Sequence, residues 1–234
     1  MKIGILQTGH MPDEMKDDLG SYAGMFATLL EGNGFDYVDY FVVDGVFPAS
    51  VDEADGWLIT GSKHGVYEDH DWIAPLEQLI RDIRASGKPL IGVCFGHQII
   101  AQALGGHVEK FKGGWSAGPV TYQVNGEDMV LNAWHQDQVL TPPEGAEVYA
   151  STDFCANAGM VIDGQILTIQ PHPEFTKFFI EGLIRHRAPG VLPPQMIADV
   201  GAVIDTPLDD QAFGQMMADF FNKRAAEAVI STKV

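Results

Sequence analysis

The first half of the chain alternates short, almost wholly apolar runs with longer segments in which apolar residues recur every three or four positions. A short apolar run bounded by turn residues predicts a buried strand, and the wider spacing predicts a helix with one apolar face. The runs predict strands over residues 2–7, 37–43, 56–60 and 91–94. The segments with helical spacing predict helices over residues 17–31, 72–85 and 97–104, each ending near a glycine.

The pattern changes after Gly106. Short strand-like segments separated by turns predict strands over residues 119–124, 129–131, 146–151, 160–162 and 166–170. This pattern favours an antiparallel or mixed extension that returns the chain to the first sheet near His172. Residues 187–208 are rich in Pro, Gly and small side chains and predict one short helix over residues 195–200, and residues 209–228 predict a final helix.

Helices placed between short buried strands predict a parallel sheet with right-handed crossovers. The expected fold class is therefore α/β, with a mostly parallel central sheet flanked by helices and a smaller antiparallel extension. We expect residues 1–186 to form one domain and residues 187–234 to form a C-terminal tail and helix packed on that same domain. In an open sheet of this kind, functional sites lie at the carboxyl ends of the strands.

Composition narrows the classes of function. The chain has 234 residues, 46% hydrophobic and 20% charged, and its formal net charge of −18 disfavours binding to nucleic acid. No apolar stretch approaches membrane-spanning length, and the first strand begins at Lys2 with no signal peptide before it. Two cysteines, one of them assigned to chemistry below, leave no pair for a structural disulfide, which favours a reducing, cytoplasmic setting.

The strongest chemical signal is the run Gly92-Val93-Cys94-Phe95-Gly96, which joins a predicted strand to a predicted helix. Strand, G-x-C-x-G and helix form the cysteine version of the nucleophile elbow, in which strained and crowded backbone requires small flanking residues. The turn places the sulfur at the positive end of a helix, which favours the thiolate. Taken alone, the same run also fits a small buried cysteine in an apolar core.

A second segment supplies a base for that thiol. The strand over residues 166–170 leads into His172, and the prolines on either side of His172 keep the chain extended and deny it a helix. Residues i and i+2 of an extended chain point the same way, so His172 and Glu174 can lie side by side. A nucleophilic thiol needs a base, and the base needs a group that fixes its tautomer. Without Cys94, an exposed turn at a strand end would be the better interpretation.

Together these segments resemble the class I glutamine amidotransferase family, whose pattern is a G-x-C-x-G-x-Q elbow followed later by a strand ending in H-P-E. The matching residues run from Gly92 to Gln98 and from His172 to Glu174. The order Cys, His, Glu also agrees, and the resemblance covers roughly residues 1–185. It implies the flavodoxin-like architecture of that family and a catalytic triad of Cys94, His172 and Glu174.

The resemblance also implies an oxyanion hole made of backbone N–H groups. The family places one of these donors in a glycine-rich turn after a strand, which here is Gly61-Ser62, with serine in place of the usual second glycine. A second donor is expected at Phe95, next to the nucleophile. Which of Gly61 and Ser62 provides the first donor stays open, and an ordinary strand-to-loop turn is the alternative.

Four further residues match family positions that bind the substrate. Gln98 matches a glutamine that contacts the substrate, the alternative being a residue on the helix surface. Trp134, His135 and Gln136 match a segment whose backbone holds the α-amino-acid end of the substrate. A loop with a hydrogen-bonded histidine fits this second group equally well.

The implied reaction is cysteine-dependent hydrolysis of the γ-carboxamide of glutamine through a γ-glutamyl thioester, with no metal and no organic cofactor. Ammonia would go to an unknown acceptor or to a separate synthetase subunit, because the chain shows no nucleotide-binding loop. The alternative within the same chemistry is a stand-alone γ-glutamyl peptidase, which releases another amine. A second alternative is a non-catalytic regulatory module of the same fold, and the intact Cys94, His172 and Glu174 argue against it.

Two other groups of residues contain side chains that can bind metal ions, but the sequence does not favour a metal site at either. The run Glu68-Asp69-His70-Asp71 is predicted to be an acidic helix start, which the helix dipole favours. Cys94 and His97 have C-x-x-H spacing, but no second pair completes a zinc site. The sequence therefore predicts no metal site, and Cys155 is expected to be a buried core thiol.

Overall fold

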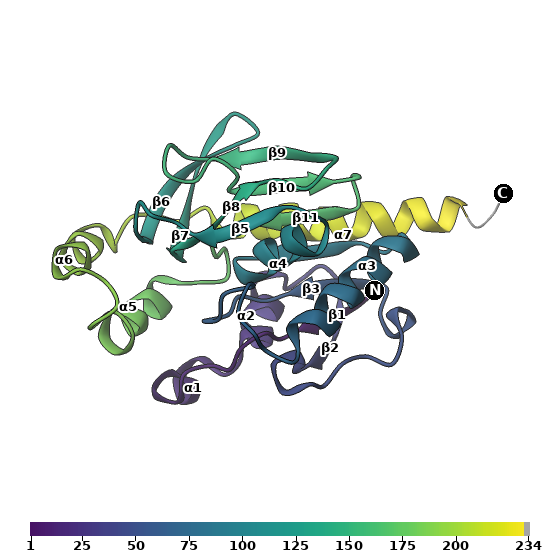
Figure 1. Cartoon of the computed structure of the whole chain (residues 1–234), viewed down its shortest axis with the longest axis horizontal. Coiled ribbons are helices and arrows are strands. Elements are labelled where there is room, and N and C mark those ends of the chain that lie inside the picture. Colours follow the sequence, from purple (N-terminus) through teal and green to yellow (C-terminus); the bar gives the residue numbers. More distant parts are fainter. Residues whose placement is uncertain (232–234) are drawn as a thin grey trace.

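The central sheet has nine strands, five of them parallel. In this computed structural model, which describes residues 1–231, the strand order is β2-β1-β3-β4-β11-β10-β9-β6-β7 (Figure 1). The parallel strands are β2 (Asp36–Tyr40), β1 (Lys2–Leu6), β3 (Gly56–Ile59), β4 (Leu90–Val93) and β11 (Ile166–Ile169). The antiparallel strands are β10 (Gly159–Ile162), β9 (Ala146–Ser151), β6 (Ser116–Val124) and β7 (Glu127–His135). The predicted α/β fold, a mostly parallel sheet with an antiparallel extension, is confirmed.

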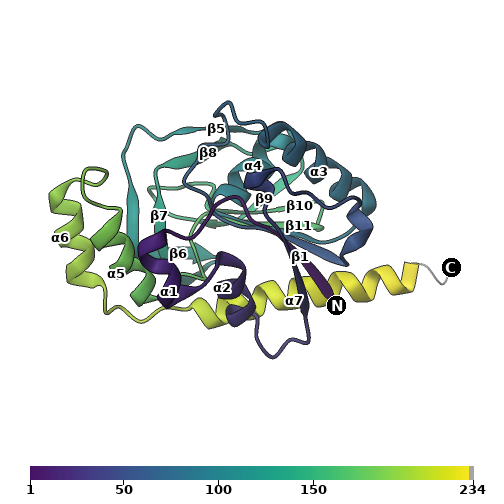
Figure 2. The same ribbon diagram turned by 90° about the horizontal axis from the view of Figure 1, so that it is seen from below.

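Helices cover both faces of the parallel strands. The α-helices are α1 (Asp13–Leu19), α2 (Tyr22–Leu29), α3 (Ile73–Ser86), α4 (Phe95–Ala103), α5 (Lys177–His186), α6 (Pro194–Val203) and α7 (Asp210–Ser231), and residues of α1, α5 and α6 form a separate small cluster. Helices α3 and α4 pack on one face, and α2 and α7 pack on the other (Figure 2). None of the helices within residues 1–231 is long and apolar enough to cross a membrane.

The alternation of side chains along each strand builds the two cores. In β3, Trp57 and Ile59 pack on the face covered by α3 and α4, whereas Leu58 between them packs on the opposite face. Phe213 and Phe221 of α7 belong to the same core as Leu58, and all five side chains are fully buried. Neighbouring residues of a strand point to opposite faces, so a continuous apolar run such as β3 is a strand buried on both sides.

The helix predicted over residues 17–31 is two helices, so the prediction of one is wrong. Gly20 follows α1 with φ 71° and ψ −114°, a conformation that does not continue a helix. Ser21 then caps α2, because its Oγ accepts a hydrogen bond from the N–H of Gly24 at 3.1 Å. The chain changes direction between the two helices.

One α-helix and two strands lie outside the predicted ones, namely α5 and the antiparallel pair β5 (His107–Lys110) and β8 (Asp137–Thr141). Helix α5 begins after Thr176, whose hydroxyl accepts a hydrogen bond from the N–H of Phe179 at 3.3 Å. Its residues Phe179, Ile180 and Leu183 are buried at helical spacing. Strands β5 and β8 are short and pair only with each other, so their strand character depends on a partner that is distant in sequence.

The C-terminal segment packs on the rest of the chain. Helix α6 lies against β6, where Val200 reaches within 2.6 Å of the position that a Cβ at Gly118 would take. The carboxylate of Asp209 accepts a hydrogen bond from the N–H of Val130 at 2.7 Å, just before α7 begins. Helix α7, yellow in Figure 1, then runs along the sheet.

Candidate active site

The turn between β4 and α4 holds Cys94 in a conformation that residues with side chains rarely adopt. Its φ is 52° and its ψ is −102°, and α4 begins at the next residue, Phe95, two residues before the predicted start. The N–H of Cys94 donates to the carbonyl oxygen of Ile169 at 2.8 Å, which ties the turn to β11. Backbone strain of this kind persists only where the surroundings fix it. Strand, strained cysteine and helix together have the form of a nucleophile elbow.

The two glycines beside Cys94 are required by close backbone contacts. A Cβ at Gly92 would lie 2.5 Å from the carbonyl oxygen of Gly96. A Cβ at Gly96 would lie 2.4 Å from the carbonyl oxygen of Ile59 in β3. Both distances are far below van der Waals contact, and neither neighbour is a flexible side-chain end. The prediction that small residues must flank the cysteine is therefore confirmed.

His172 and Glu174 lie beside this turn at the end of β11. The Nδ1 atom of His172 is 2.7 Å from Oε1 of Glu174, and each residue is 4% exposed. The N–H of His172 donates to the carbonyl oxygen of Asn132 at 2.8 Å, an isolated antiparallel bridge to β7. The ring of Phe175 stacks on the imidazole, with centroids 3.7 Å apart and planes 4° from parallel. The imidazole is thus fixed by a carboxylate, a backbone bridge and an aromatic ring.

The surroundings of His172 favour its charged form. Burial by itself would lower its pKa, but the charges of Glu174 and Cys94, and hydrogen bonds to both side chains, raise the pKa to about 10. A thiol beside an imidazole with this preference can pass its proton to the ring and become a thiolate. The arrangement can therefore generate a nucleophile at neutral pH.

The turn after β3 reaches the same place. A Cβ at Gly61 would lie 2.7 Å from Cε1 of His172, so only glycine leaves room for the imidazole. The hydroxyl of Thr8 lies 2.9 Å from the carbonyl oxygen of Gly61, and the hydroxyl of Ser62 donates to the carbonyl oxygen of Thr8 at 2.7 Å. Within residues 1–231, the N–H groups of Gly61 and Ser62 have no hydrogen-bond acceptor. The turn therefore offers backbone donors next to the imidazole, as does the N–H of Phe95 at the start of α4.

Gln98 lies one turn of α4 beyond the cysteine. Its side-chain amide donates to the carbonyl oxygen of Asp137 at 2.9 Å and to Oε1 of Gln170 at 3.1 Å. It is 3% exposed, so the alternative of a helix-surface residue is wrong. These bonds connect α4 to the end of β11 and to the start of β8. Contact between Gln98 and a substrate stays a prediction.

The segment from Trp134 to Gln136 lies where β7 passes into β8. His135 is buried, its Nδ1 is 3.2 Å from the carbonyl oxygen of Asp137, and its Nε2 has no partner within the described part of the chain. Burial lowers the pKa of His135 to about 4, against the effect of that hydrogen bond, so the ring is neutral at pH 7. Gln136 donates to the carbonyl oxygen of Phe111 at 3.3 Å, and Trp134 packs against Trp115 with centroids 6.3 Å apart. A substrate-binding role for these residues stays a prediction.

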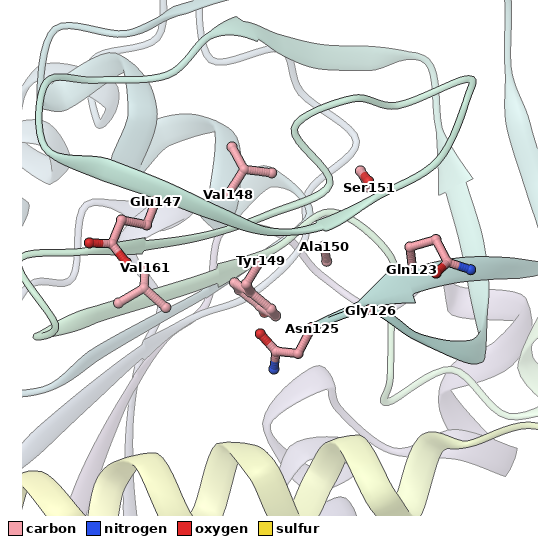
Figure 3. A pocket seen from close by; sticks show the side chains of 9 residues that line it. All are labelled: Gln123, Asn125, Gly126, Glu147, Val148, Tyr149, Ala150, Ser151 and Val161. Carbon is pink, nitrogen blue, oxygen red and sulfur yellow. The ribbon is translucent and has the colours of Figure 1, made fainter.

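A surface hollow elsewhere on the sheet is not part of this arrangement. It has a volume of about 550 Å³ and is lined by Gln123, Asn125, Gly126, Glu147, Val148, Tyr149, Ala150, Ser151 and Val161 (Figure 3). These residues come from β9, β10 and the hairpin between β6 and β7. None of the residues predicted to act in chemistry or substrate binding lines the hollow.

Comparison with known proteins agrees with the elbow geometry. The family model for glutamine amidotransferase class-I matches residues 42–178, more than half of the chain. The chain belongs to this family. Its members include hydrolytic amidotransferases and peptidases, which supports the assignment of the chain as an enzyme.

Individual members of the class I amidotransferase family resemble the chain to different extents. Gamma-glutamyl peptidase 4 from Arabidopsis thaliana is 31% identical over 232 residues, covering 92% of this chain and 92% of that protein. A glutamine-hydrolyzing GMP synthase from Pyrobaculum aerophilum is 33% identical over 164 residues, covering 66% of this chain and 31% of the synthase. A crystal structure of a glutamine amidotransferase from Thermotoga maritima covers 95% of this chain and 98% of its own, with a TM-score of 0.73 at 18% identity, which shows the shared fold.

Sequence reasoning missed several residues that shape the site of this family member. Thr8 and Phe175 fix the Gly61 turn and the imidazole, but neither belongs to the motifs used above. Tyr22 is partly buried near the charges of Glu174 and Cys94, and its removal from solvent is the main reason that its pKa is raised. Such contacts join parts of the chain that are distant in sequence, so local spacing gives no signal for them.

Proposed function

We propose that the chain hydrolyses γ-glutamyl amides with Cys94 as nucleophile, His172 as base and Glu174 as the group that orients the base. One observation carries the proposal: the imidazole of His172, buried where the charge of Cys94 at the elbow acts on it, has its Nδ1 atom 2.7 Å from Oε1 of Glu174. A base held between a carboxylate and a thiol is the arrangement that nucleophilic catalysis by cysteine needs.

The first half of the reaction forms a thioester. His172 takes the proton of Cys94, and the thiolate attacks the γ-carbonyl carbon of the substrate. The oxygen of the tetrahedral intermediate accepts hydrogen bonds from the N–H of Phe95 and from the N–H of Gly61 or Ser62. The C–N bond then breaks, and His172 gives its proton to the departing amine. A γ-glutamyl thioester remains on the sulfur.

The second half of the reaction releases glutamate. His172 takes a proton from a water molecule, and the resulting hydroxide adds to the thioester carbonyl. The same N–H groups hold the second tetrahedral oxyanion. When the C–S bond breaks, the sulfur leaves as the thiolate beside protonated His172, which restores the starting pair. Glu174 takes no proton in this scheme and holds the imidazole in one tautomer and orientation.

Two candidate substrates differ in the amine that the reaction releases. Glutamine, with ammonia passed to a partner synthetase, is the first substrate predicted from the sequence, and the relative among the GMP synthases supports it over 66% of this chain. A γ-glutamyl peptide, with release of another amine, is supported by a γ-glutamyl peptidase that aligns with 92% of both chains. We place the peptide first, because that likeness extends over nearly the whole length of both proteins.

A substrate panel tests this order. Purified protein is mixed with glutamine, γ-glutamyl dipeptides and γ-glutamyl conjugates of thiol compounds at equal concentrations, and glutamate release is followed by mass spectrometry. We expect fast cleavage of at least one γ-glutamyl peptide without a partner, and slower turnover of glutamine. Turnover of glutamine alone, accelerated by a synthetase, would instead establish the ammonia donor. If no γ-glutamyl compound is cleaved, the proposed activity is wrong.

Covalent labelling tests the nucleophile separately. A glutamine analogue that carries an electrophile should label Cys94 and leave Cys155 unmodified, because Cys155 is 2% exposed and burial raises its pKa to about 12. Cys94→Ser should fold normally, lose the label and lose nearly all turnover. Cys155→Ser is the matched control and should keep both. Labelling that maps mainly to Cys155 would contradict the assignment.

A further inference from the structure

The loop between β3 and α3 brings together three side chains of the kind that bind metal ions. Nδ1 of His64 and Nε2 of His70 lie 3.3 Å and 2.8 Å from the same atom, Oε2 of Glu68. The three ligand atoms all lie within 4.8 Å of one another. The two imidazole rings have centroids 4.3 Å apart and planes 73° apart, so they approach the carboxylate from different directions.

The sequence interpretation of this segment as an acidic helix start does not account for the cluster. Helix α3 begins at Ile73, and neither its cap residue, Trp72, nor any side chain makes a capping hydrogen bond there. Glu68 points instead to two histidines, one of which, His64, lies outside the acidic run. The carboxylate is therefore used within the loop and does not stabilise the first turn of the helix.

We infer that His64, Glu68 and His70 form a binding site for a divalent transition-metal ion, and that Zn²⁺ fits it best. Two imidazole nitrogens and one carboxylate oxygen are a donor set that zinc uses, whereas Mg²⁺ and Ca²⁺ take oxygen ligands. Zinc binds these atoms at about 2.0–2.2 Å, so neighbouring ligand atoms of a tetrahedral site lie about 3.4 Å apart. Two of the separations, 3.3 Å and 2.8 Å, are already near this spacing.

The site is open enough to admit an ion. The side chains of His64, His70 and Glu68 are 22%, 33% and 44% exposed. An ion can therefore reach the three ligand atoms from solvent, and its fourth coordination position is available to a water molecule. In a fully buried cluster, the chain would have to open before an ion could reach the ligand atoms. The three ligand atoms of this loop need no such opening.

The backbone around the cluster holds the ligands in place. The N–H of Glu68 donates to the carbonyl oxygen of Gly65 at 3.1 Å, and the N–H of His70 donates to that of Glu68 at 3.1 Å. The ring of Trp72 stacks on His70, with centroids 5.9 Å apart and planes 12° from parallel. Fixed ligands lose less freedom when an ion binds, which favours binding.

A bound ion would stiffen the loop that connects two parts of the candidate active site. The N–H of His64 donates to the hydroxyl of Ser62 at 3.2 Å, next to the candidate oxyanion donors. At the other end of the loop, Trp72 contacts Phe95, the residue after Cys94, with ring centroids 5.4 Å apart. The ion would act on loop geometry and would not take part in bond breaking. This inference does not depend on the proposed reaction.

Zinc binding to the metal-free Cys94→Ser protein tests the site. This background removes the reactive thiol, which would compete for zinc. Affinity and stoichiometry are measured by competition with a chromophoric chelator, and unfolding is followed by circular dichroism. We expect one Zn²⁺ per chain and a higher Tm with zinc than with a chelator. Adding His70→Ala should lower the affinity for zinc by more than about 10-fold. Losing a group that hydrogen-bonds to a metal ligand already costs about 10-fold or more in affinity, and losing the ligand itself costs at least as much.

The chain offers matched controls for this experiment. His107 and Glu109 form an exposed pair 3.3 Å apart with no second histidine, so His107→Ala removes a histidine but no cluster and should leave zinc affinity unchanged. Glu68→Gln keeps the shape of the carboxylate and should weaken zinc binding even if the histidine variant folds poorly. The inference is overturned if Cys94→Ser binds no zinc, or if Glu68→Gln and His70→Ala bind it as tightly as their background does.

Discussion

Replacing Gly61 by alanine tests whether the position of the imidazole controls the reaction. The new Cβ would lie 2.7 Å from Cε1 of His172, whereas ordinary van der Waals contact begins near 3.4 Å, so the two groups must separate by about 0.7 Å. The imidazole is held by Glu174 and by the stacked ring of Phe175, and the turn is held by the hydroxyl of Thr8. Whichever side yields, the imidazole changes its position relative to Cys94 or the N–H donors change theirs.

The expected loss follows from the size of that shift. A misplacement of about 1 Å in a reacting constellation costs about 10²-fold in rate, which is about 2.7 kcal/mol of activation free energy. We therefore expect kcat/KM of Gly61→Ala to fall by about 10²-fold on the best substrate of the panel. The rate of alkylation of Cys94 by iodoacetamide at pH 7 should fall as well, because the thiolate loses its partner. Overpacking should cost only about 1–3 kcal/mol in stability, so the protein stays folded.

Gly9→Ala is the matched control, because Gly9 borders the same turn. A Cβ at Gly9 would lie 3.7 Å from the carbonyl oxygen of Gly61 and 3.7 Å from Cα of Ser62, which is ordinary contact. This variant should keep both kcat/KM and the alkylation rate. If Gly61→Ala keeps kcat/KM within twofold of the parent while its Tm is unchanged, the contact between the turn and the imidazole does not control the reaction.

Two further predictions concern the other buried histidines and the triad. His172→Ala should be nearly inactive and Glu174→Gln should keep some activity, because losing a base costs more than losing the group that orients it. If His172→Ala keeps wild-type turnover, the base lies elsewhere, and His135 is the next candidate. Burial lowers the pKa of His97 to about 3 and that of His135 to about 4, whereas an unfolded histidine has a pKa of about 6.5. The unfolded chain therefore binds more protons than the folded chain, and the folded state loses stability as the pH falls from 6.5 toward 4. Urea unfolding at pH 6 and at pH 5 should show that the two rings together lower the free energy of unfolding by roughly 2 kcal/mol over this pH unit. His97→Gln should halve this loss, and an unchanged loss would contradict the burial of a neutral imidazole at His97.

Four strands of the parallel sheet, β1, β3, β4 and β11, could be predicted from sequence because each is an apolar run that is almost wholly buried, whereas β2 at the sheet edge is only partly buried. The break between α1 and α2 could not, because it depends on the backbone of Gly20 and the cap at Ser21, while the apolar spacing continues across both helices. Strands β5 and β8 are stabilised by each other, and a single short run contains no information about such a partner. The missed helix α5 had a local signal in Thr176 and the apolar spacing after it.

The candidate site also has a part that local sequence patterns predict and a part that depends on contacts between distant segments. Cys94 between its glycines, and His172 two residues from Glu174, are local patterns, and the structure places the two segments in contact. Gly61 follows β3 and His172 follows β11, and only folding brings the ends of these two strands, on either side of β4, to the same edge of the sheet. The sequence could therefore name Gly61 but could not give the reason that this residue must be small. The sequence offers no reason to group His64 with the run from Glu68 to Asp71, because His64 lies before that run. Only the fold of the loop brings its imidazole to Glu68.

The bridge between Asn132 and His172 links the timing of folding to the appearance of the reactive thiol. Asn132 lies on β7, the last strand in the order of the sheet, yet it accepts the N–H of His172 and donates its side-chain amide to the carbonyl oxygen of Phe175 at 2.8 Å. This bridge is isolated and lies outside the ladder that pairs β11 with β4, so the parallel strands do not need it in order to pair. During refolding, the parallel strands can therefore assemble while the imidazole is still without its final support. Recovery of a reactive Cys94 would then report the docking of an edge strand, and not the collapse of the hydrophobic core.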